Sequence, residues 1–248
     1  MNMRNKLLYG LVGKNISHSF SPKYFKQKFL KEKIAADYIL FDIDSSEKLP
    51  EIISSTPDLR GFNVTIPYKK EIMNLLQQVS KEAKAVGSVN TVKITDSGLS
   101  GYNTDVVGFR NSLLPLIKGS LPLKALILGT GGAAEAVKFV LNEQSIHFQQ
   151  VSRGKLENTL TYSEVTQSVL QGFRLIINTT PLGMFPNVNQ APAIPFEYLT
   201  QHHILYDLIY NPKETLFLKE GRRAGAKVKN GLEMLYLQAE ASWKIWQE

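Results

Sequence analysis

Stretches with the apolar pattern of strands alternate along nearly the whole chain with stretches whose pattern is typical of helices. In the first hundred residues, the pattern predicts strands at 7–12, 37–42, 61–66 and 89–94, helices at 22–33 and 47–54, and a helical segment in two pieces over 69–86. Ser21 is the predicted N-cap of the helix that begins with Pro22. This alternation indicates an α/β unit.

A second unit begins near residue 105, where a predicted helix over 105–114 precedes a series of buried strands. We expect strands at 123–128, 147–151, 174–178 and 204–209, with a helix at 133–142. Strands that alternate with helices in this way predict a doubly wound parallel sheet of the Rossmann type. The last segment, 231–246, has apolar residues at spacings of three and four and is predicted to be one amphipathic helix.

A glycine-rich turn follows the strand at 123–128. Gly129, Gly131 and Ala134 fit the pattern G-x-G-x-x-A, directly after an apolar strand and directly before a helix. The first glycine permits a tight turn, the second allows the backbone to approach a pyrophosphate, and the alanine allows the helix to pack closely on the strand. Unpaired N–H groups at the helix start then favour phosphate. The turn therefore predicts a dinucleotide site.

The end of the next strand indicates which dinucleotide is bound. Sites for NAD usually have an acidic residue there, whereas this chain has Ser152, Arg153 and Lys155, and the nearest acid is Glu157. An arginine at this position can pair with a 2′-phosphate, and the serine and lysine can add donors. The pattern therefore favours NADP.

Polar residues gather at predicted strand ends in the first unit. Ser19 and Ser21 lie between a strand and a helix, where hydroxyl groups and a helix start can hold a carboxylate. Thr65 ends a strand that Pro67 stops, and Lys69 follows. The Asn103-Thr104-Asp105 segment is, taken alone, more typical of a turn and helix cap than of a catalytic acid.

The amino-acid composition and net charge exclude several kinds of functional site and binding partner. The 248 residues include no cysteine, which excludes disulfides and thiolate metal sites and suits the cytoplasm. The net charge of +7 favours an anionic ligand, and since no nucleic-acid-binding motif is present we expect no nucleic acid partner. We expect no metal, because His147 is isolated and His202 and His203 point to opposite faces of a strand. We also expect no signal peptide and no membrane span.

Several motifs occur in the order seen in shikimate dehydrogenases, and the chain resembles that family from about residue 8 to residue 240. The motifs are His18-Ser19-Phe20-Ser21-Pro22, Asn63-Val64-Thr65-Ile66-Pro67-Tyr68-Lys69, Val89-Asn90-Thr91, Asn103-Thr104-Asp105 with Gly108, the glycine turn, Asn178-Thr179-Thr180 with Gly183-Met184, Tyr206-Asp207 with Tyr210, and Gly231 with Gln238. The resemblance implies reversible, NADPH-dependent reduction of 3-dehydroshikimate to shikimate. It also implies a substrate domain formed by 1–104 and 231–248, and an NADP domain formed by 105–230.

The resemblance also assigns roles to residues. Lys69 and Asp105 would bracket the reacting oxygen, and either could carry the proton. The implied substrate-binding residues are Ser19, Ser21, Thr65, Asn90, Tyr210 and Gln238. The implied cofactor-binding residues are Gly129, Thr130, Gly131, Gly132, Ala133, Ser152, Arg153, Lys155, Thr180, Met184, Leu208 and Gly231. Met184 and Leu208 would lie near the nicotinamide, and the protein would be a monomer or a homodimer.

The chain departs from the family pattern at several points. Lys14-Asn15 replaces the usual Asn-Pro, which suggests a looser loop, and Ser152-Arg153-Gly154 replaces Asn-Arg-Thr, which removes phosphate donors. Pro181-Leu182 stands where serines are common, and the chain ends at Glu248, where longer members add a helix. The alternatives are a quinate/shikimate dehydrogenase that uses NAD or NADP, a folate-dependent methylene dehydrogenase, and a non-catalytic paralogue that binds NADP or shikimate-like ligands.

Overall fold

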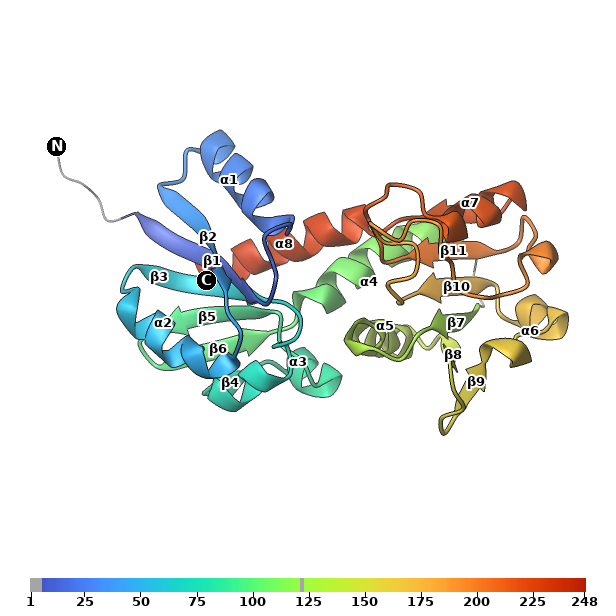
Figure 1. Cartoon of the computed structure of the whole chain (residues 1–248), viewed down its shortest axis with the longest axis horizontal. Helices are drawn as coiled ribbons and strands as arrows, with labels where there is room; N and C mark the ends of the chain where they lie inside the picture. The colour runs from blue at the N-terminus through green and yellow to red at the C-terminus, as the bar shows by residue number, and fades with distance from the viewer. Residues whose placement is uncertain (1–5, 121–122) are drawn as a thin grey trace. The chain divides into compact units, whose positions relative to one another are not determined.

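The computed structural model describes residues 6–120 and 123–248 of the chain. Two compact units make up the fold (Figure 1): residues 1–104 with 239–248, and residues 105–238. The last helix, α8 (Leu232–Gln247), therefore contributes to both units. The chain returns to the first unit at Ala239, inside this helix, and not at Gly231 where the predicted boundary lies.

The first unit is built on a mixed sheet. Its strands are β1 (Leu7–Gly13), β2 (Ala36–Asp42), β3 (Leu59–Val64), β4 (Gln78–Val79), β5 (Thr91–Thr95) and β6 (Gly98–Tyr102). Its helices are α1 (Ser21–Glu32), α2 (Leu49–Ser55) and α3 (Lys81–Val86), with 3₁₀ turns at Ser46–Lys48 and Glu71–Leu75. The order is β2-β1-β3-β5-β6-β4. β1 pairs in parallel with both β2 and β3, whereas β5 is antiparallel to its neighbours.

An aromatic core joins α1 and α8 to this sheet. Phe25 of α1 and Trp246 of α8 pack together with Tyr9 and Tyr38 of the sheet. The Trp246 indole also donates a hydrogen bond of 2.9 Å to the Val92 carbonyl. A Cβ at Gly61 would lie 2.4 Å from that indole nitrogen, so only glycine admits the tryptophan here.

The second unit contains a fully parallel sheet. Its strands are β7 (Lys124–Leu128), β8 (His147–Ser152), β9 (Thr159–Thr161), β10 (Leu175–Asn178), β11 (Ile204–Asp207) and β12 (Lys227–Lys229). Its helices are α4 (Thr104–Ile117), α5 (Gly132–Glu143), α6 (Gln167–Gly172), α7 (Leu216–Arg223) and the first part of α8, up to Gln238, with 3₁₀ turns at Tyr162–Glu164 and Phe196–Tyr198. The strand order β12-β11-β10-β7-β8-β9 is that of a Rossmann fold.

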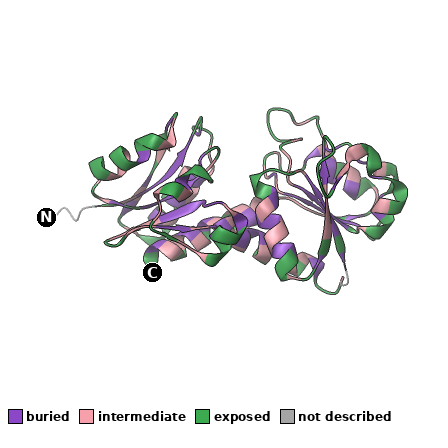
Figure 2. Ribbon diagram, turned by 90° about the horizontal axis from the view of Figure 1, so that it is seen from below, coloured by how far each residue is buried: buried purple, intermediate pink, exposed green. Residues whose placement is uncertain are grey.

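Both faces of this sheet are covered, as the alternation of strands and helices predicts. Leu205 and Phe217 belong to a buried cluster on the side of α6 and α7. On the other side, Phe109 and Ser112 of α4 contact Tyr206 of β11, through an edge-on ring contact and a hydrogen bond of 2.6 Å. Figure 2 shows the strands of each sheet mostly buried and the outer helix faces exposed. The predicted α/β fold with a doubly wound sheet is confirmed.

Two local predictions are wrong. Ser21 does not cap α1, because it is the first helical residue, Phe20 holds the cap position and no side chain caps the helix. The helix predicted in two pieces over 69–86 is a turn over 66–70, a 3₁₀ turn, the short strand β4 and then α3. Lys69 therefore lies in a turn and not at a helix start.

Candidate active site

In the first unit, the polar loops meet where the strand order reverses around β1. β1 and β3 are parallel neighbours, so the loops that follow them leave the same edge of the sheet. The Thr65 amide donates 2.9 Å to the Val12 carbonyl, and the Lys14 amide donates 3.3 Å to the Ile66 carbonyl. A Cβ at Gly13 would lie 2.5 Å from the Thr65 methyl group. Glycine therefore allows the two loops to pack against each other.

The loop after β1 is anchored by a carboxylate from the neighbouring strand. Asp42, the last residue of β2, accepts hydrogen bonds from the amides of Asn15, at 2.8 Å, and Ile16, at 3.2 Å. Asn15 has a φ of 58°, a left-handed conformation that asparagine tolerates. These bonds stabilise the loop that leads to Ser19. The sequence suggests a looser loop here, because Lys14-Asn15 replaces the usual Asn-Pro.

The Ser21 hydroxyl faces the sheet. Ser21 is 9% exposed, and it hydrogen-bonds the Tyr38 phenol, whose pKa is raised above its usual range by burial. Tyr38 also donates 2.9 Å to the Asn63 side chain. Ser21 is thus held in a buried polar network, whereas Ser19 is half-buried in the loop.

Asn90 and Lys69 are connected to the same edge by backbone bonds. The Val64 amide donates to the Asn90 carbonyl at 2.9 Å, and the Val89 amide donates to the Lys69 carbonyl at 2.8 Å. The Asn90 Oδ1 accepts from the Thr104 amide at 2.7 Å and from its hydroxyl at 3.1 Å. Within the part of the chain that the structure describes, the Asn90 Nδ2 has no hydrogen-bond partner. Thr65, Lys69 and Asn90 are therefore brought together, with an amide donor left for a ligand.

Asp105 and Gln238 lie on two helices that approach each other to backbone contact. A Cβ at Gly108 would lie 2.6 Å from the Met234 carbonyl and 3.0 Å from the Gln238 Cβ. Gly108 is one turn after Asp105 on α4, so the close approach sets both side chains relative to each other. Lys69 belongs to the first unit and Asp105 to the second, and their joint action stays a prediction.

The glycine turn of the second unit is shaped for a ligand. Gly129 has a φ of 113°, and a Cβ there would lie 2.7 Å from the Thr179 hydroxyl. At Gly131 and Gly132, in contrast, a Cβ would meet no protein atom within 4 Å. Residues 130–133 are exposed, and α5 begins at Gly132, so its first N–H groups face open space. This geometry fits a pyrophosphate at the helix start.

The end of β8 offers one unpaired cation. The Ser152 hydroxyl is buried and donates to the Gly154 carbonyl. Lys155 is paired with Glu164 at 2.8 Å, and its ammonium group together with the Thr161 amide lowers the pKa of Glu164 to about 2. Arg153 is exposed and has no ion pair among the described residues. Of the three predicted phosphate donors, Arg153 is thus the one whose charge is not already balanced.

The remaining predicted residues lie in the loops after β10, β11 and β12. Thr180 donates from its amide, at 3.0 Å, and from its hydroxyl, at 2.7 Å, to the Asn178 side chain. Met184 is 47% exposed, Leu208 is half-buried, and burial raises the pKa of the Tyr210 phenol. The Gly231 amide donates to the Ile209 carbonyl at 3.0 Å, and a Cβ at Gly231 would collide with the Leu208 carbonyl.

Sequence reasoning assigned no role to Asp207, although it lies in one of the motifs. Its side chain is completely buried at the end of β11 and accepts hydrogen bonds from Asn178, Ile209 and Thr215. Burial raises the pKa of this carboxyl to about 6, despite the three donors. A polar residue that ends a buried strand was the signal that could have singled it out.

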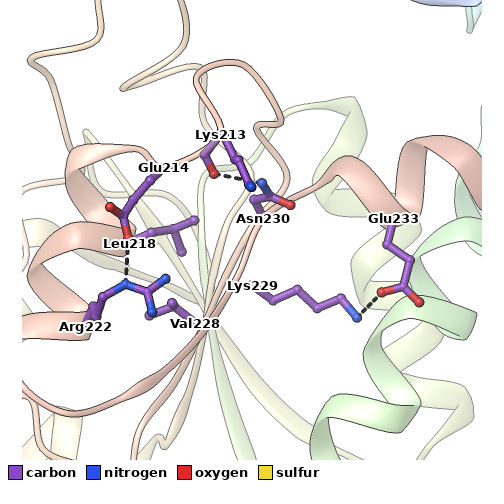
Figure 3. Close-up of a pocket in the computed structure, with 8 residues that line it drawn as sticks. All are labelled: Lys213, Glu214, Leu218, Arg222, Val228, Lys229, Asn230 and Glu233. Atoms are coloured by element: carbon purple, nitrogen blue, oxygen red, sulfur yellow. Dashed lines mark hydrogen bonds and ion pairs between the residues drawn. The ribbon is translucent and has the colours of Figure 1, made fainter.

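A hollow of about 540 Å³ in the second unit does not coincide with these residues (Figure 3). Four of its charged side chains form two pairs: Arg222 donates to Glu214 at 2.7 Å, and Lys229 pairs with Glu233. Asn230 donates 2.7 Å to the Lys213 carbonyl. No predicted site residue lines this hollow, so we place the candidate site at the strand ends.

Residues 6–120 and 123–248 hold neither a candidate metal site nor a candidate membrane span. No group of three or more potential ligands for a metal ion was found there. Among the same residues, no helix has the length and apolar character needed to cross a membrane.

Comparisons with known proteins identify the class. The model of a family described as the shikimate dehydrogenase substrate binding domain matches residues 11–92. A relative named shikimate dehydrogenase (NADP(+)), from Methanococcus maripaludis, is 37% identical, and the match covers 99% of this chain and 93% of the relative. The chain belongs to the shikimate dehydrogenase family.

Solved structures agree with this membership. A shikimate 5-dehydrogenase from Thermus thermophilus, in complex with NADP(H) and shikimate, is 31% identical, with a TM-score of 0.83 over 97% of this chain and 93% of the other. A quinate dehydrogenase from Corynebacterium glutamicum, in complex with NAD, is 26% identical, with a TM-score of 0.87 over 97% of this chain and 93% of the other. The fold is thus shared by enzymes whose names differ in substrate and whose complexes differ in cofactor.

Proposed function

We propose that this protein is an NADP-dependent shikimate dehydrogenase that reversibly reduces 3-dehydroshikimate to shikimate in aromatic amino acid biosynthesis. The observation that carries the proposal is the pair of different sites at the strand ends: a glycine turn with an unpaired Arg153 in one unit, and hydroxyl, amide and lysine side chains in the other. The names of the relatives support the same activity and cofactor.

The second unit, from residue 105 to about 230, would bind NADP. Gly129, Thr130, Gly131, Gly132 and Ala133 would hold the pyrophosphate at the start of α5. Arg153 would pair with the 2′-phosphate, with Ser152 and Lys155 in supporting positions. Thr180, Met184, Leu208 and Gly231 would line the nicotinamide end. When bound, the cofactor supplies the hydride that reduces the ketone.

Residues of the first unit, together with Tyr210 and Gln238 of the second, would bind the substrate. Ser19, Ser21 and Tyr210 would hold the carboxylate, and Thr65, Asn90 and Gln238 would hydrogen-bond the ring hydroxyl groups. The free Nδ2 of Asn90 supports this assignment, since a ligand hydroxyl can accept from it.

Lys69 and Asp105 would carry the proton chemistry. Addition of a hydride to the ketone leaves negative charge on its oxygen, which the Lys69 ammonium stabilises and protonates. Asp105 keeps the lysine oriented and charged. In the reverse direction, the same pair removes the proton from the hydroxyl group of shikimate, so we treat them as one acid–base unit.

An absorbance assay at the nicotinamide band tests the proposal. Purified protein is offered shikimate or quinate, each with NADP or NAD, and we expect fast reduction only with shikimate and NADP. Comparable rates with quinate or NAD would place the protein with the broader quinate/shikimate dehydrogenases. Absence of reduction in all four combinations would contradict the proposed activity.

We also propose that the enzyme acts in the cytoplasm, as a monomer or homodimer. The absence of cysteine from the sequence supports the first point, since a disulfide-free chain suits a reducing compartment. Light scattering on the purified protein measures its mass against the 27.8 kDa of one chain, and a mass above that of a dimer would contradict the second.

A further inference from the structure

A buried network of side chains joins the loops after β10 and β11. The Asp207 Oδ1 accepts from the Asn178 Nδ2 and from the Ile209 amide, both at 3.0 Å. The Asp207 Oδ2 accepts from the Thr215 hydroxyl at 2.6 Å. Asn178 and Asp207 are 0% exposed and Thr215 is 1% exposed, so water does not compete for these bonds.

This network also holds residues of the loops that follow β10 and β11. Through its Oδ1, Asn178 holds the amide and hydroxyl of Thr180. Its carbonyl accepts from the Leu208 amide at 3.0 Å. Gly183 packs against Thr215, because a Cβ at Gly183 would lie 3.3 Å from the Thr215 Cβ. Three segments, 178–184, 207–210 and the start of α7, are therefore fixed around one carboxylate.

The hydrogen-bonding groups around Asp207 match a carboxyl side chain better than an amide. It offers two acceptor oxygens, and all three groups that face it are donors. An asparagine would keep one acceptor oxygen and turn an N–H group toward the Thr215 hydroxyl, which already accepts from the Leu218 amide at 3.4 Å. Keeping an unpaired carboxylate buried has a cost, since none of the described residues forms an ion pair with Asp207.

We propose that Asp207 is a positioning residue that holds the loops after β10 and β11 in the geometry required to bind the nicotinamide end of NADP. The inference rests on the proposed function, because Thr180, Leu208 and Gly231 are the groups it would place. Asp207 itself does not contact the cofactor in this account. Because Asp207 orders these loops in the free protein, less conformational entropy is lost when the cofactor binds.

Four variants test the inference. Asp207→Asn weakens the network at its centre, and Thr215→Val removes the donor to Oδ2 at nearly constant volume. Thr215→Ser keeps the hydroxyl group and should restore the wild-type behaviour. Ser112→Ala is the matched control, because it also removes a buried hydroxyl in the same unit, bonded to Tyr206 beside Asp207, but its partner does not reach the two loops.

The first measurement uses the cofactor-free protein, so it does not depend on the proposed activity. Amide hydrogen exchange should become faster at Ile209 and Thr180 in Asp207→Asn, by on the order of tenfold, since a hydrogen bond to a charged group is lost or weakened. Ser112→Ala should leave exchange at both amides unchanged. Equal protection in all variants would overturn the inference.

The second measurement is the dissociation constant of NADP, from calorimetry. Asp207→Asn and Thr215→Val should each raise it by on the order of tenfold, while Thr215→Ser and Ser112→Ala match the wild type. If the wild type binds NADP and all four variants bind equally well, positioning by Asp207 is wrong and the proposed function stands. If the wild type binds no NADP, both are wrong.

Discussion

The two sheets present different kinds of group where their strand order reverses. Around β1 and β3, the loops carry side chains: Ser19, Thr65 and Lys69. Around β7 and β10, the loop after β7 carries almost none, because Gly131 and Gly132 expose backbone N–H groups instead. A small polyhydroxy acid is recognised by hydrogen bonds from individual side chains, whereas a pyrophosphate is recognised by a row of amides. In our proposal, the same topological position thus serves two kinds of chemistry.

The largest expected effect concerns the side chain that we assign to proton transfer. Lys69→Ala should lower kcat by about 10³-fold, in the range that general acid–base groups contribute, with a small change in KM for shikimate. The neighbouring Lys70→Ala is the control and should keep wild-type rates. Steady-state kinetics with both substrates varied measures this. A loss confined to KM would mean that Lys69 only binds substrate.

A methyl group added to the glycine turn should weaken NADP binding without unfolding the protein. Gly131 has a φ of −80° and its Cβ position is empty, so Gly131→Ala is compatible with the folded protein. We expect NADP affinity to fall on the order of tenfold or more, because the methyl group occupies the place of the phosphate, and the melting temperature to stay unchanged. Gly172→Ala, where a Cβ also meets nothing, is the control. Unaltered NADP binding in Gly131→Ala would remove the pyrophosphate from this turn.

Arg153 is the side chain that distinguishes NADP from NAD in our proposal. Arg153→Ala should reduce the preference for NADP over NAD by on the order of tenfold, through loss of a charge-assisted bond to the 2′-phosphate. Lys155→Ala should have a much smaller effect, since Glu164 already pairs with Lys155. The ratio of kcat/KM for the two cofactors measures it, and an unchanged ratio would show that Arg153 does not read the phosphate.

The glycine of the first unit should behave in the opposite way to Gly131. A Cβ at Gly13 would lie 2.5 Å from methyl groups of both Ile16 and Thr65, so Gly13→Ala forces the two loops apart. We expect a loss of about 1–3 kcal/mol in the free energy of unfolding, as for other overpacked sites. Denaturant titration measures it. An unaltered unfolding free energy would show that the loops are not as tightly packed as their geometry indicates.

The comparison also explains which features the sequence could predict. The glycine turn can be predicted from the sequence because its residues are consecutive and lie between a strand and a helix. The loop anchor at Asp42 and the close approach at Gly108 were not, since each depends on a partner far away along the chain: Asn15 for one and Met234 for the other. Long-range pairing is set by tertiary packing, which local patterns do not encode.

Ser21 shows a related error. Serine before proline at the start of a helix is a typical cap, and the sequence pattern alone supports that interpretation. In the fold, the buried Tyr38 phenol needs a partner, and the Ser21 hydroxyl bonds to it. A buried hydroxyl group on the neighbouring strand therefore outweighs the local preference for capping.

The last expected effect is the pH dependence that Asp207 confers on stability. Burial raises its pKa from 3.8 to about 6 in the folded protein, so between these values the folded state binds a proton that the unfolded state does not. The contribution of Asp207 to the free energy of unfolding is therefore highest below about pH 4 and falls as the pH rises through 6. Across that window, the wild type should lose about 3 kcal/mol relative to Asp207→Asn, which has no such titration. Denaturant titrations from pH 4 to 8 measure this, with Asp96→Asn, an exposed carboxyl, as control. If the difference between wild type and Asp207→Asn stays constant with pH, the Asp207 carboxyl is not held in a site that favours its neutral form, and its three donors outweigh its burial.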